Sequence, residues 1–373
     1  MKVLISIDSF KGSLSSIEAG EAIKRGILRA KSDTEVVVLP LGDGGEGTTD
    51  ALRLAYKAKR RTITTLNPIG RKIRASYYIV GNRAIMEMSA SAGLCLIKES
   101  QRDPMHTTTY GVGLMIRDAI ENGATEFLIG VGGSATNDGG IGMLQALGFS
   151  FLDCNGNEVG YGAYGAGSVC KVFRGRAMTA LKDCTFKILC DVQNPLLGPN
   201  GASYVYSYQK GARGEVINLL EGCLKSFAKA TRVSLPKADP YAPGAGAAGG
   251  LGFAFLSYLG AELLSGAHEV LRATRFEEHL EGANIVITGE GRIDSQSVNG
   301  KAPIIVAEVA KRHSKRVIGL CGITGDGYEA CYEAGIDEIH AIADPSKTTE
   351  ENMKKEIAIA NLENKAYEIF SKI

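Results

Sequence analysis

Short apolar runs alternate with amphipathic segments along most of this chain. Each apolar run leads into a loop that carries glycine and acidic side chains, and the runs open the segments 2–12, 36–52, 125–140, 186–198, 283–294 and 316–327. Other segments repeat their apolar residues at helical spacing, namely 16–30, 107–123, 301–313 and 351–373. This alternation is typical of βαβ units, in which a parallel sheet is buried on both faces. The pattern therefore predicts an α/β protein.

Local residue patterns indicate where several predicted helices begin and end. Ser15 and Glu18 have the spacing of a capping box before one apolar helical segment. Gly123 follows another such segment, as glycine commonly does after a helix. Pro303 stands in the first turn of a third, where a missing N–H group costs little.

Residues 60–98 interrupt the βαβ rhythm. Their apolar and polar residues alternate one by one, as in antiparallel strands, and turns are expected at 67–68 and 81–82. We therefore predict two domains, with the active site in the cleft between them. The first is a discontinuous, Rossmann-like parallel-sheet domain made of 1–60 and 275–373. The second is an inserted α/β domain with a mixed sheet, residues 61–274.

Composition narrows the functional classes. The chain has 373 residues and is 45% hydrophobic, which is enough for more than one core. Its 42 basic and 41 acidic residues give a net charge of +1, so there is no electrostatic basis for binding nucleic acid or an acidic membrane. Residues 244–261 carry no charge but are rich in glycine, so we expect a packed interior loop and helix rather than a membrane span.

The 8 cysteines show no C-x-x-C pair or other metal-binding spacing. In a chain of this length we expect them to be small, reduced, mostly buried side chains. The first residues, MKVLISIDSF, reach Asp8 too early for a signal peptide. Together these features predict a cytoplasmic protein.

The acidic loops point to chemistry because of where they fall. In open α/β sheets, ligands bind beyond the carboxyl ends of the strands. Glycine lets the backbone approach a ligand, and the N–H groups that follow attract phosphate. Carboxylates beside a phosphate favour Mg²⁺ between them. A single aspartate such as Asp138 is equally consistent with a helix N-cap, but Asp43 and Glu46 among four glycines are not. The set predicts phosphoryl transfer.

Two glycine patterns favour dinucleotide binding instead of phosphoryl transfer. Residues 130–135 fit the G-x-G-x-x-A fingerprint of dinucleotide-binding folds, and residues 244–249 fit G-x-G-x-x-G. In the first, five residues separate the glycines from the start of the helical pattern. In the second, no strand precedes the glycines. Both matches are therefore weak, and a Walker A loop is missing as well.

The chain resembles the bacterial type-1 glycerate kinases in several motifs, which follow the order of that family over nearly the whole chain. They are DSFKGSLSS (8–16), GDGGEGT (42–48), GVGGSATNDGG (130–140), CDVQNPLLG (190–198), PGAGAAGGLGF (243–253) and TGEGRIDSQSVNGKAP (288–303). The resemblance implies ATP- and Mg²⁺-dependent phosphorylation of D-glycerate, usually at its 2-hydroxyl, and a two-domain α/β fold.

Phosphorylation of glycerate needs a cationic anchor, a base near one hydroxyl and a clamp on the γ-phosphate. We expect Asp191 or Asp8 to accept or orient the hydroxyl proton, with Lys11 as a further catalytic residue. The predicted substrate-binding residues are Lys11, Arg292, Asn194 and Ser9. The predicted phosphate- or nucleotide-binding residues are Gly132, Gly133, Ser134, Gly244, Gly246, Gly249 and Lys301. The predicted Mg²⁺ ligands are Asp43, Glu46, Glu290 and Asp294.

These predictions make D-glycerate and ATP the expected partners, without nucleic acid or membrane; the sequence is compatible with an oligomer. Two alternatives belong to other functional classes. One is an NAD(P)-dependent reductase of a small hydroxy acid, which would use the loop at 130–135. The other is a non-catalytic sensor that binds a nucleotide or glycerate.

Overall fold

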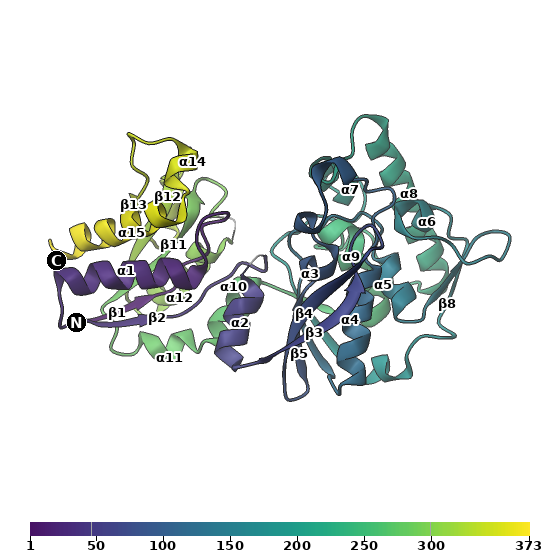
Figure 1. Ribbon diagram of the computed structural model, residues 1–373, viewed down its shortest axis with the longest axis horizontal. Helices are drawn as coiled ribbons and strands as arrows, with labels where there is room; N and C mark the ends of the chain where they lie inside the picture. The colour runs from purple at the N-terminus through teal and green to yellow at the C-terminus, as the bar shows by residue number, and fades with distance from the viewer. Residues whose placement is uncertain (46, 299) are drawn as a thin grey trace. The chain divides into compact units, whose positions relative to one another are not determined.

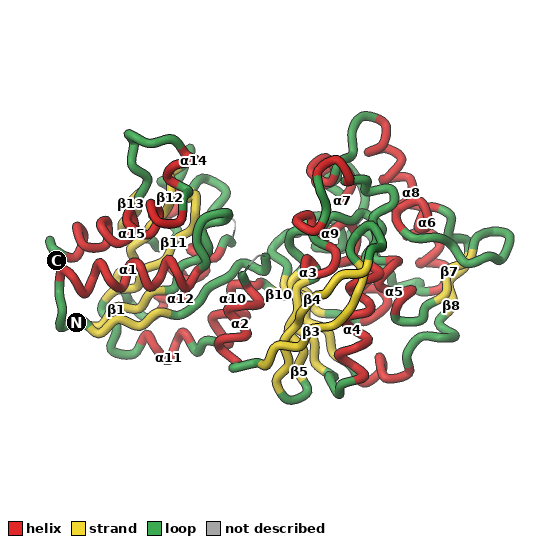
Figure 2. The backbone as a smooth tube through the Cα atoms, viewed as in Figure 1, coloured by secondary structure: helices red, strands yellow, loops and turns green. Residues whose placement is uncertain are grey.

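The computed structural model describes residues 1–45, 47–298 and 300–373 (Figure 1). The chain divides into two compact units, one made of Met1–Tyr56 with Ser265–Ile373 and the other of Lys57–Leu264. The first unit contains a parallel sheet and the second a mixed sheet, with helices and strands alternating along the chain (Figure 2). This architecture confirms the predicted α/β fold class.

The sheet of the first unit is wholly parallel, with the strand order β13-β12-β11-β1-β2. Its strands are β1 (Lys2–Ile5), β2 (Glu35–Val38), β11 (Ile285–Ile293), β12 (Arg316–Thr324) and β13 (Glu338–Ala341). Its helices are α1 (Ser16–Ala30), α2 (Thr48–Tyr56), α10 (Gly266–Ala273), α11 (Phe276–Leu280), α12 (Ala302–Arg312), α13 (Ala330–Glu333), α14 (Thr349–Asn352) and α15 (Lys355–Phe370).

Helices cover both faces of this sheet, because successive residues of a strand point to opposite sides. Val3 and Ile5 belong to a core with α1 and α15, whereas Leu4 belongs to a core with α10, α11 and α12. Helices α1 and α15 pack closely against each other: a Cβ added at Gly26 of α1 would lie 2.2 Å from the carbonyl oxygen of Glu363 in α15. The central strands are therefore buried on both sides, as their continuous apolar sequence predicts.

The second unit has a mixed sheet of order β10-β9-β6-β5-β4-β3, in which β10, β9, β6 and β5 are mutually parallel and β4 is antiparallel to both of its neighbours, β5 and β3. Its strands are β3 (Lys59–Leu66), β4 (Lys72–Val80), β5 (Arg83–Glu87), β6 (Glu126–Gly130), β9 (Thr185–Leu189) and β10 (Glu262–Leu264), with β7 (Ser150–Leu152) and β8 (Lys171–Phe173) as a separate antiparallel pair. Its helices are α3 (Ser89–Ala92), α4 (Tyr110–Glu121), α5 (Ile141–Ala146), α6 (Gly162–Gly167), α7 (Ala202–Tyr206), α8 (Glu215–Ser234) and α9 (Ala247–Leu259).

Several local predictions are confirmed. Ser15 and Glu18 form the capping box of α1, and Pro303 lies in the first turn of α12. The interrupted region forms the antiparallel strands β3, β4 and β5. The uncharged stretch is a buried loop followed by α9. Within the described parts of the chain, no helix has both the length and the apolar character needed to span a membrane.

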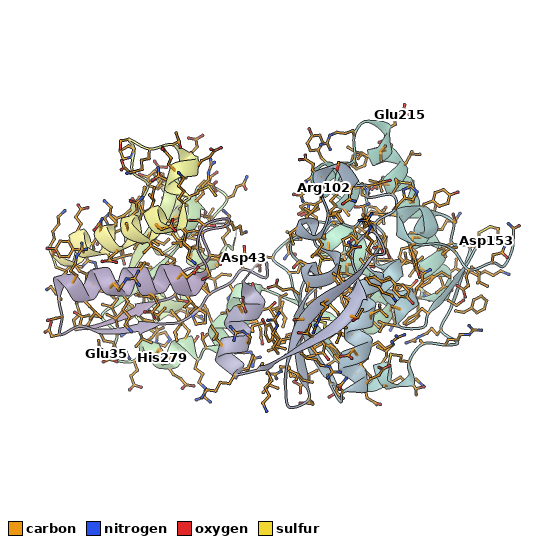
Figure 3. The ribbon with its side chains drawn as sticks, in the orientation of Figure 1. Glu35, Asp43, Arg102, Asp153, Glu215 and His279 are labelled. Atoms are coloured by element: carbon orange, nitrogen blue, oxygen red, sulfur yellow. A yellow bond between two sulfur atoms is a disulfide. The ribbon has the colours of Figure 1, made fainter. Side chains whose placement is uncertain are left out.

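The prediction that all cysteines are reduced is wrong. Cys154 and Cys170 form a disulfide beside the β7–β8 pair, close to Asp153, which is labelled in Figure 3. The two cysteines are 16 residues apart and meet because Leu152 pairs with Lys171 when the strands align. Sequence spacing could not reveal this pairing, because it depends on the register of two very short strands.

Candidate active site

Polar side chains gather at the carboxyl edge of the parallel sheet in the first unit. β1 leads into a loop with Asp8, Ser9 and Lys11, and the adjacent β11 carries Glu290 near its end. From β1 the chain continues to β2 on one side, whereas from β11 it continues to β12 and β13 on the other. The topological switch point of the sheet therefore lies between β1 and β11. Ligands of open α/β sheets bind in the crevice at such a point.

Asp8 is almost fully buried, with 4% of its surface exposed. Its Oδ1 accepts a hydrogen bond from the Ser9 amide at 2.8 Å. Burial, and next the negative charge of Asp43, raise the pKa of the Asp8 carboxyl from 3.8 to about 7, although Lys11 partly offsets them. A carboxyl group with a pKa near 7 can exchange a proton at neutral pH, as general acids and bases do.

Lys11 connects two of the acidic loops. Its Nζ lies 3.2 Å from Oδ2 of Asp43, which is labelled in Figure 3 in the loop between β2 and α2. Burial lowers the pKa of the Lys11 ammonium group, but the attraction of Asp43 and Asp8 outweighs it and raises that pKa. The side chain is 64% exposed, so the ion pair contributes little to stability. Lys11 is therefore a charged group that can exchange Asp43 for an anionic ligand at low cost.

The end of β11 supplies a second set of paired charges. Lys301 Nζ lies 3.4 Å from Glu290 Oε1, and Arg292 Nε lies 3.1 Å from Asp294 Oδ2. The Ser297 hydroxyl donates a hydrogen bond to Glu290 Oε1 at 2.8 Å. Burial raises the pKa of Glu290 above its ordinary value, against the attraction of Lys301. The edge thus holds cations and anions side by side.

The glycines around Glu290 let β11 reach this position. A Cβ added at Gly289 would lie 1.7 Å from the carbonyl oxygen of Leu320 in β12. Such a contact is impossible, so only glycine allows the two strands to approach each other here. The Thr-Gly-Glu-Gly sequence therefore places a half-buried carboxylate at the switch point.

A pocket of about 560 Å³ lies on this edge of the first unit. Asp8, Lys11 and Glu290 line it together with residues of α15 and of the segment 342–353, which follows β13. Ser9, Arg292, Asp294 and Lys301 are also in its wall. The structure therefore brings seven predicted site residues into one pocket, and Asp43 contacts that set through Lys11.

Apart from Glu46, the remaining predicted residues lie in the second unit. β6 and β9 are adjacent and parallel, so the loops that follow them share one edge of the mixed sheet. The first loop carries Gly132, Gly133 and Ser134, and the second carries Asp191 and Asn194. In both units, therefore, predicted site residues lie in loops that follow adjacent parallel strands.

The space beside the glycines of the segment at the start of α9 is occupied by other parts of the protein. A Cβ added at Gly249 would lie 2.0 Å from the Thr136 carbonyl oxygen, and one at Gly246 would lie 2.1 Å from that of Pro195. At Gly244, the Leu263 side chain would lie 2.4 Å away. These glycines are explained by close packing, and their predicted contact with phosphate stays a prediction.

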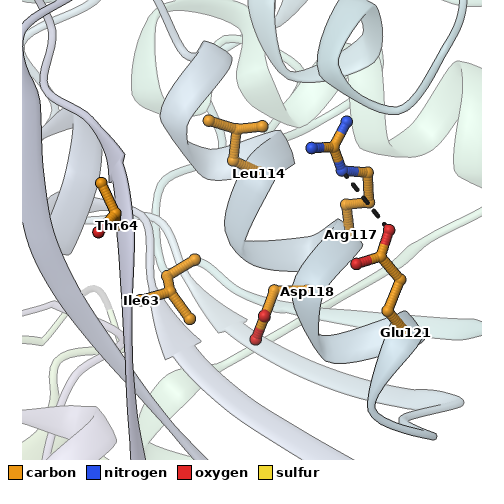
Figure 4. Close-up of a pocket in the computed structure, with 6 residues that line it drawn as sticks. All are labelled: Ile63, Thr64, Leu114, Arg117, Asp118 and Glu121. Carbon is orange, nitrogen blue, oxygen red and sulfur yellow. Dashed lines mark ion pairs between the residues drawn. The ribbon is translucent and has the colours of Figure 1, made fainter.

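A smaller pocket of about 340 Å³ lies between β3 and α4 of the second unit (Figure 4). Its charged residues already pair within the protein. Asp118 accepts hydrogen bonds from Arg61 and Tyr77, and Arg117 lies 3.8 Å from Glu121. This network joins the helix to the sheet, so we assign the pocket a structural role.

Comparison with known proteins identifies the family. A family model described as the glycerate kinase family matches residues 3–373. The chain belongs to the glycerate kinase family. Glycerate 2-kinase of Escherichia coli strain K12 is 44% identical over 353 residues, which cover 94% of this chain and 93% of that protein. Glycerate kinase of Bacillus subtilis strain 168 is 42% identical over 344 residues, covering 92% and 90% respectively.

A solved structure agrees with this assignment. The crystal structure of a protein assigned as glycerate kinase 2 from Salmonella typhimurium LT2 superposes with a TM-score of 0.87 at 38% identity, covering 100% of this chain and 98% of that one. The family match confirms the sequence-based prediction of a kinase.

The glycerate kinase motifs do not all expose the side chains that we singled out. Both polar atoms of the Asn194 side chain already form hydrogen bonds within the protein. Its Nδ2 donates to the Asn200 carbonyl at 2.8 Å, and its Oδ1 accepts from the Tyr206 hydroxyl at 2.6 Å. Asp191 is exposed at the surface of its unit. Glu46 lies outside the described residues, and no group of three potential metal-binding side chains occurs among those that are described.

One buried charged residue escaped the sequence analysis. Lys210 is 1% exposed, and its Nζ donates to the Thr136 carbonyl at 2.7 Å. Burial lowers the pKa of its amine to about 7, against the attraction of Asp138. Asp138 itself accepts from the amides of Thr109 and Gly140, which agrees with a role at a helix start. The polar stretch YSYQKGARGE (206–215) gives no indication that its lysine is buried.

Proposed function

We propose that this protein transfers the γ-phosphoryl group of ATP to the 2-hydroxyl of D-glycerate and releases 2-phosphoglycerate. The family match supports the substrate, and a relative named glycerate 2-kinase supports the position. The observation that carries the proposal is the buried Asp8 at the switch point between β1 and β11, in a pocket that Lys11, Arg292 and Lys301 also line. Such a site can accept a proton from a hydroxyl and neutralise a phosphoryl group.

Asp8 is the group that accepts or orients the hydroxyl proton. Its pKa of about 7 leaves a substantial fraction ionised at neutral pH. A stronger base is unnecessary, because the transition state of phosphoryl transfer is loose and positioning accounts for most of the catalysis. Asp191, the other candidate, is exposed at the surface of its own unit.

Lys11, Arg292 and Lys301 supply positive charge for the transferring group and for the carboxylate of glycerate. Each is held near an acidic side chain, at 3.2, 3.1 and 3.4 Å respectively. These contacts keep the cations close to the pocket before substrate arrives. A preorganised charge lowers the free energy of the transition state without reorganisation during the reaction.

The acidic residues fit a Mg²⁺ ion bound together with nucleotide phosphates. Asp43 and Glu290 both raise the pKa of Asp8 through their negative charge, and a divalent cation would relieve this repulsion. Mg²⁺ usually takes one or two carboxylates plus phosphate oxygens, so Asp43 and Glu290 suffice as protein ligands. When bound, the ion would neutralise charge on the phosphates.

The test is incubation with ATP, Mg²⁺ and D-glycerate, with phosphorus NMR of the product. The expected product is 2-phosphoglycerate; formation of 3-phosphoglycerate would contradict the assigned position. NADH oxidation in place of ATP turnover would favour a reductase, and tight binding without turnover would favour a sensor. Asp8→Asn is expected to lower kcat on the order of a hundredfold or more, and Asp191→Ala serves as the comparison. If only Asp191→Ala loses activity, the base is Asp191.

A further inference from the structure

The pocket at the switch point is larger than glycerate requires. Its volume of about 560 Å³ lies in the range of sites for much larger ligands, whereas glycerate has only three carbons. Charged groups line it where β1 and β11 end, and the ion-paired Asp344 and Lys347 line it in the segment after β13. Apolar side chains also line it, among them Phe10, Ile323, Ile342, Pro345 and Met353. A ligand that fills this pocket has both an anionic part and a flat or apolar part.

Asn352 holds the segment after β13 as a firm wall of the pocket. Its Nδ2 donates to the carbonyl oxygens of Asp344 and Thr348 at 3.0 and 3.1 Å. Its Oδ1 accepts from the Asp344 amide at 2.8 Å. Because a backbone N–H can only donate, this last bond fixes which end of the Asn352 amide is the oxygen.

The orientation of Asn352 determines that of Asn361, which lies on α15 and also lines the pocket. Oδ1 of Asn352 can only accept, so the Asn361 group 3.1 Å from it is the donating Nδ2. Asn361 therefore presents its own Oδ1 as an acceptor. Among the described residues, no group donates a hydrogen bond to that oxygen.

We infer that this pocket receives the nucleoside half of ATP and that Asn361 Oδ1 accepts a hydrogen bond from the 6-amino group of adenine. The inference rests on the proposed kinase function. The apolar wall offers contact to the purine ring, while Lys11 and Lys301 lie on the side where the phosphates would be. Adenine carries an amino donor at position 6, whereas guanine carries an oxygen acceptor there. Two facing acceptors repel each other, so Asn361 selects ATP over GTP.

The first test measures binding of ADP and GDP by calorimetry without glycerate. The wild-type protein is expected to bind ADP at least tenfold more tightly than GDP. Asn361→Leu is expected to weaken ADP binding about tenfold, because leucine offers no acceptor to the adenine amino group. Asn364→Leu is the matched control: it lies on the same helix, bonds to Arg29 and is absent from the pocket wall, so ADP affinity should not change. Equal ADP and GDP affinities in the wild type would overturn the role of Asn361.

A second variant tests the location of the nucleoside without relying on Asn361. Met353 is 42% exposed, so Met353→Asp should fold, yet it places a negative charge in the apolar wall. We expect ADP binding to weaken at least tenfold and KM for ATP to rise similarly, while KM for glycerate changes less than twofold. Unchanged ADP affinity would place the nucleoside elsewhere.

The two proposals fail in different ways. If the wild-type protein phosphorylates glycerate but both variants bind ADP normally, the subsite is wrong and the kinase function stands. If ADP binds with the expected preference but glycerate is not phosphorylated, the subsite stands and the proposed function is wrong.

Discussion

Replacing Asp8 with asparagine should make the ligand-free protein more stable, and the gain should grow with pH. Asparagine keeps an oxygen for the Ser9 amide and removes a charge that the site disfavours. Between pH 3.8 and about 7, folded Asp8 holds a proton that the unfolded chain has released. The free energy of unfolding of the wild type therefore falls as pH rises through this window, and it is lowest above it.

The size of the effect follows from the pKa of Asp8. A rise from 3.8 to about 7, at about 1.4 kcal/mol for each pKa unit, corresponds to about 4 kcal/mol. At roughly 2–4 °C for each kcal/mol in a domain of this size, the melting temperatures should differ by about 10 °C near pH 8 and very little near pH 4.

The assay is thermal unfolding of the wild type and Asp8→Asn from about pH 4 to pH 9, in EDTA and without nucleotide. Glu18→Gln is the control that should show almost no pH dependence in this range. Hydrogen bonds from Lys355 and from the Ser15 amide lower the pKa of Glu18 from 4.5 to about 2, so its contribution to stability is present above the unfolded pKa and is lost only as pH falls toward 2, below the range of the assay. A difference between wild type and Asp8→Asn that is constant across this range would refute the proposed origin of the Asp8 pKa.

Three further predictions follow from single contacts. Lys11→Met should lower kcat/KM on the order of a hundredfold or more and change the melting temperature little, because its side chain is 64% exposed; a large loss of stability would mark it as structural. Gly249→Ala should prevent normal folding, since the new Cβ meets the Thr136 carbonyl, whereas Gly156→Ala, also at positive φ but in open space, should cost about 1–2 kcal/mol in a urea titration. Alkylation of the denatured, non-reduced protein followed by mass spectrometry should leave Cys154 and Cys170 unmodified, and full labelling would rule out their disulfide.

The positions of the acidic loops could be predicted because they depend on local order along the chain. An apolar strand followed by glycine and a carboxylate is visible in the sequence, and parallel strands put their carboxyl ends at one edge. From this reasoning we expected Asp8, Glu290 and Lys301 to lie near one another, and all three line one pocket. It also located the start of α1 from Ser15 and Glu18, whose interaction spans only three residues.

Features that depend on long-range packing could not be predicted in this way. The burial of Lys210 depends on the Thr136 carbonyl, 74 residues away. The close packing of Gly249 depends on the loop after β6. Asn361 appears in the sequence as one polar residue of an amphipathic helix, and its free acceptor emerges only from the hydrogen bonds of Asn352. Partners of this kind are set by tertiary register.

The stability cost of Asp8 and the proposed catalysis have the same physical origin. Burial and the nearby charges of Asp43 and Glu290 disfavour an ionised Asp8 in the empty site. The same conditions favour the arrival of a hydroxyl proton and of cations that neutralise the cluster. If the carboxylates of the site were already fully neutralised by neighbouring cations, they would not attract Mg²⁺ or a proton. We therefore expect ligand binding to remove much of the pH dependence that Asp8 confers on the free protein.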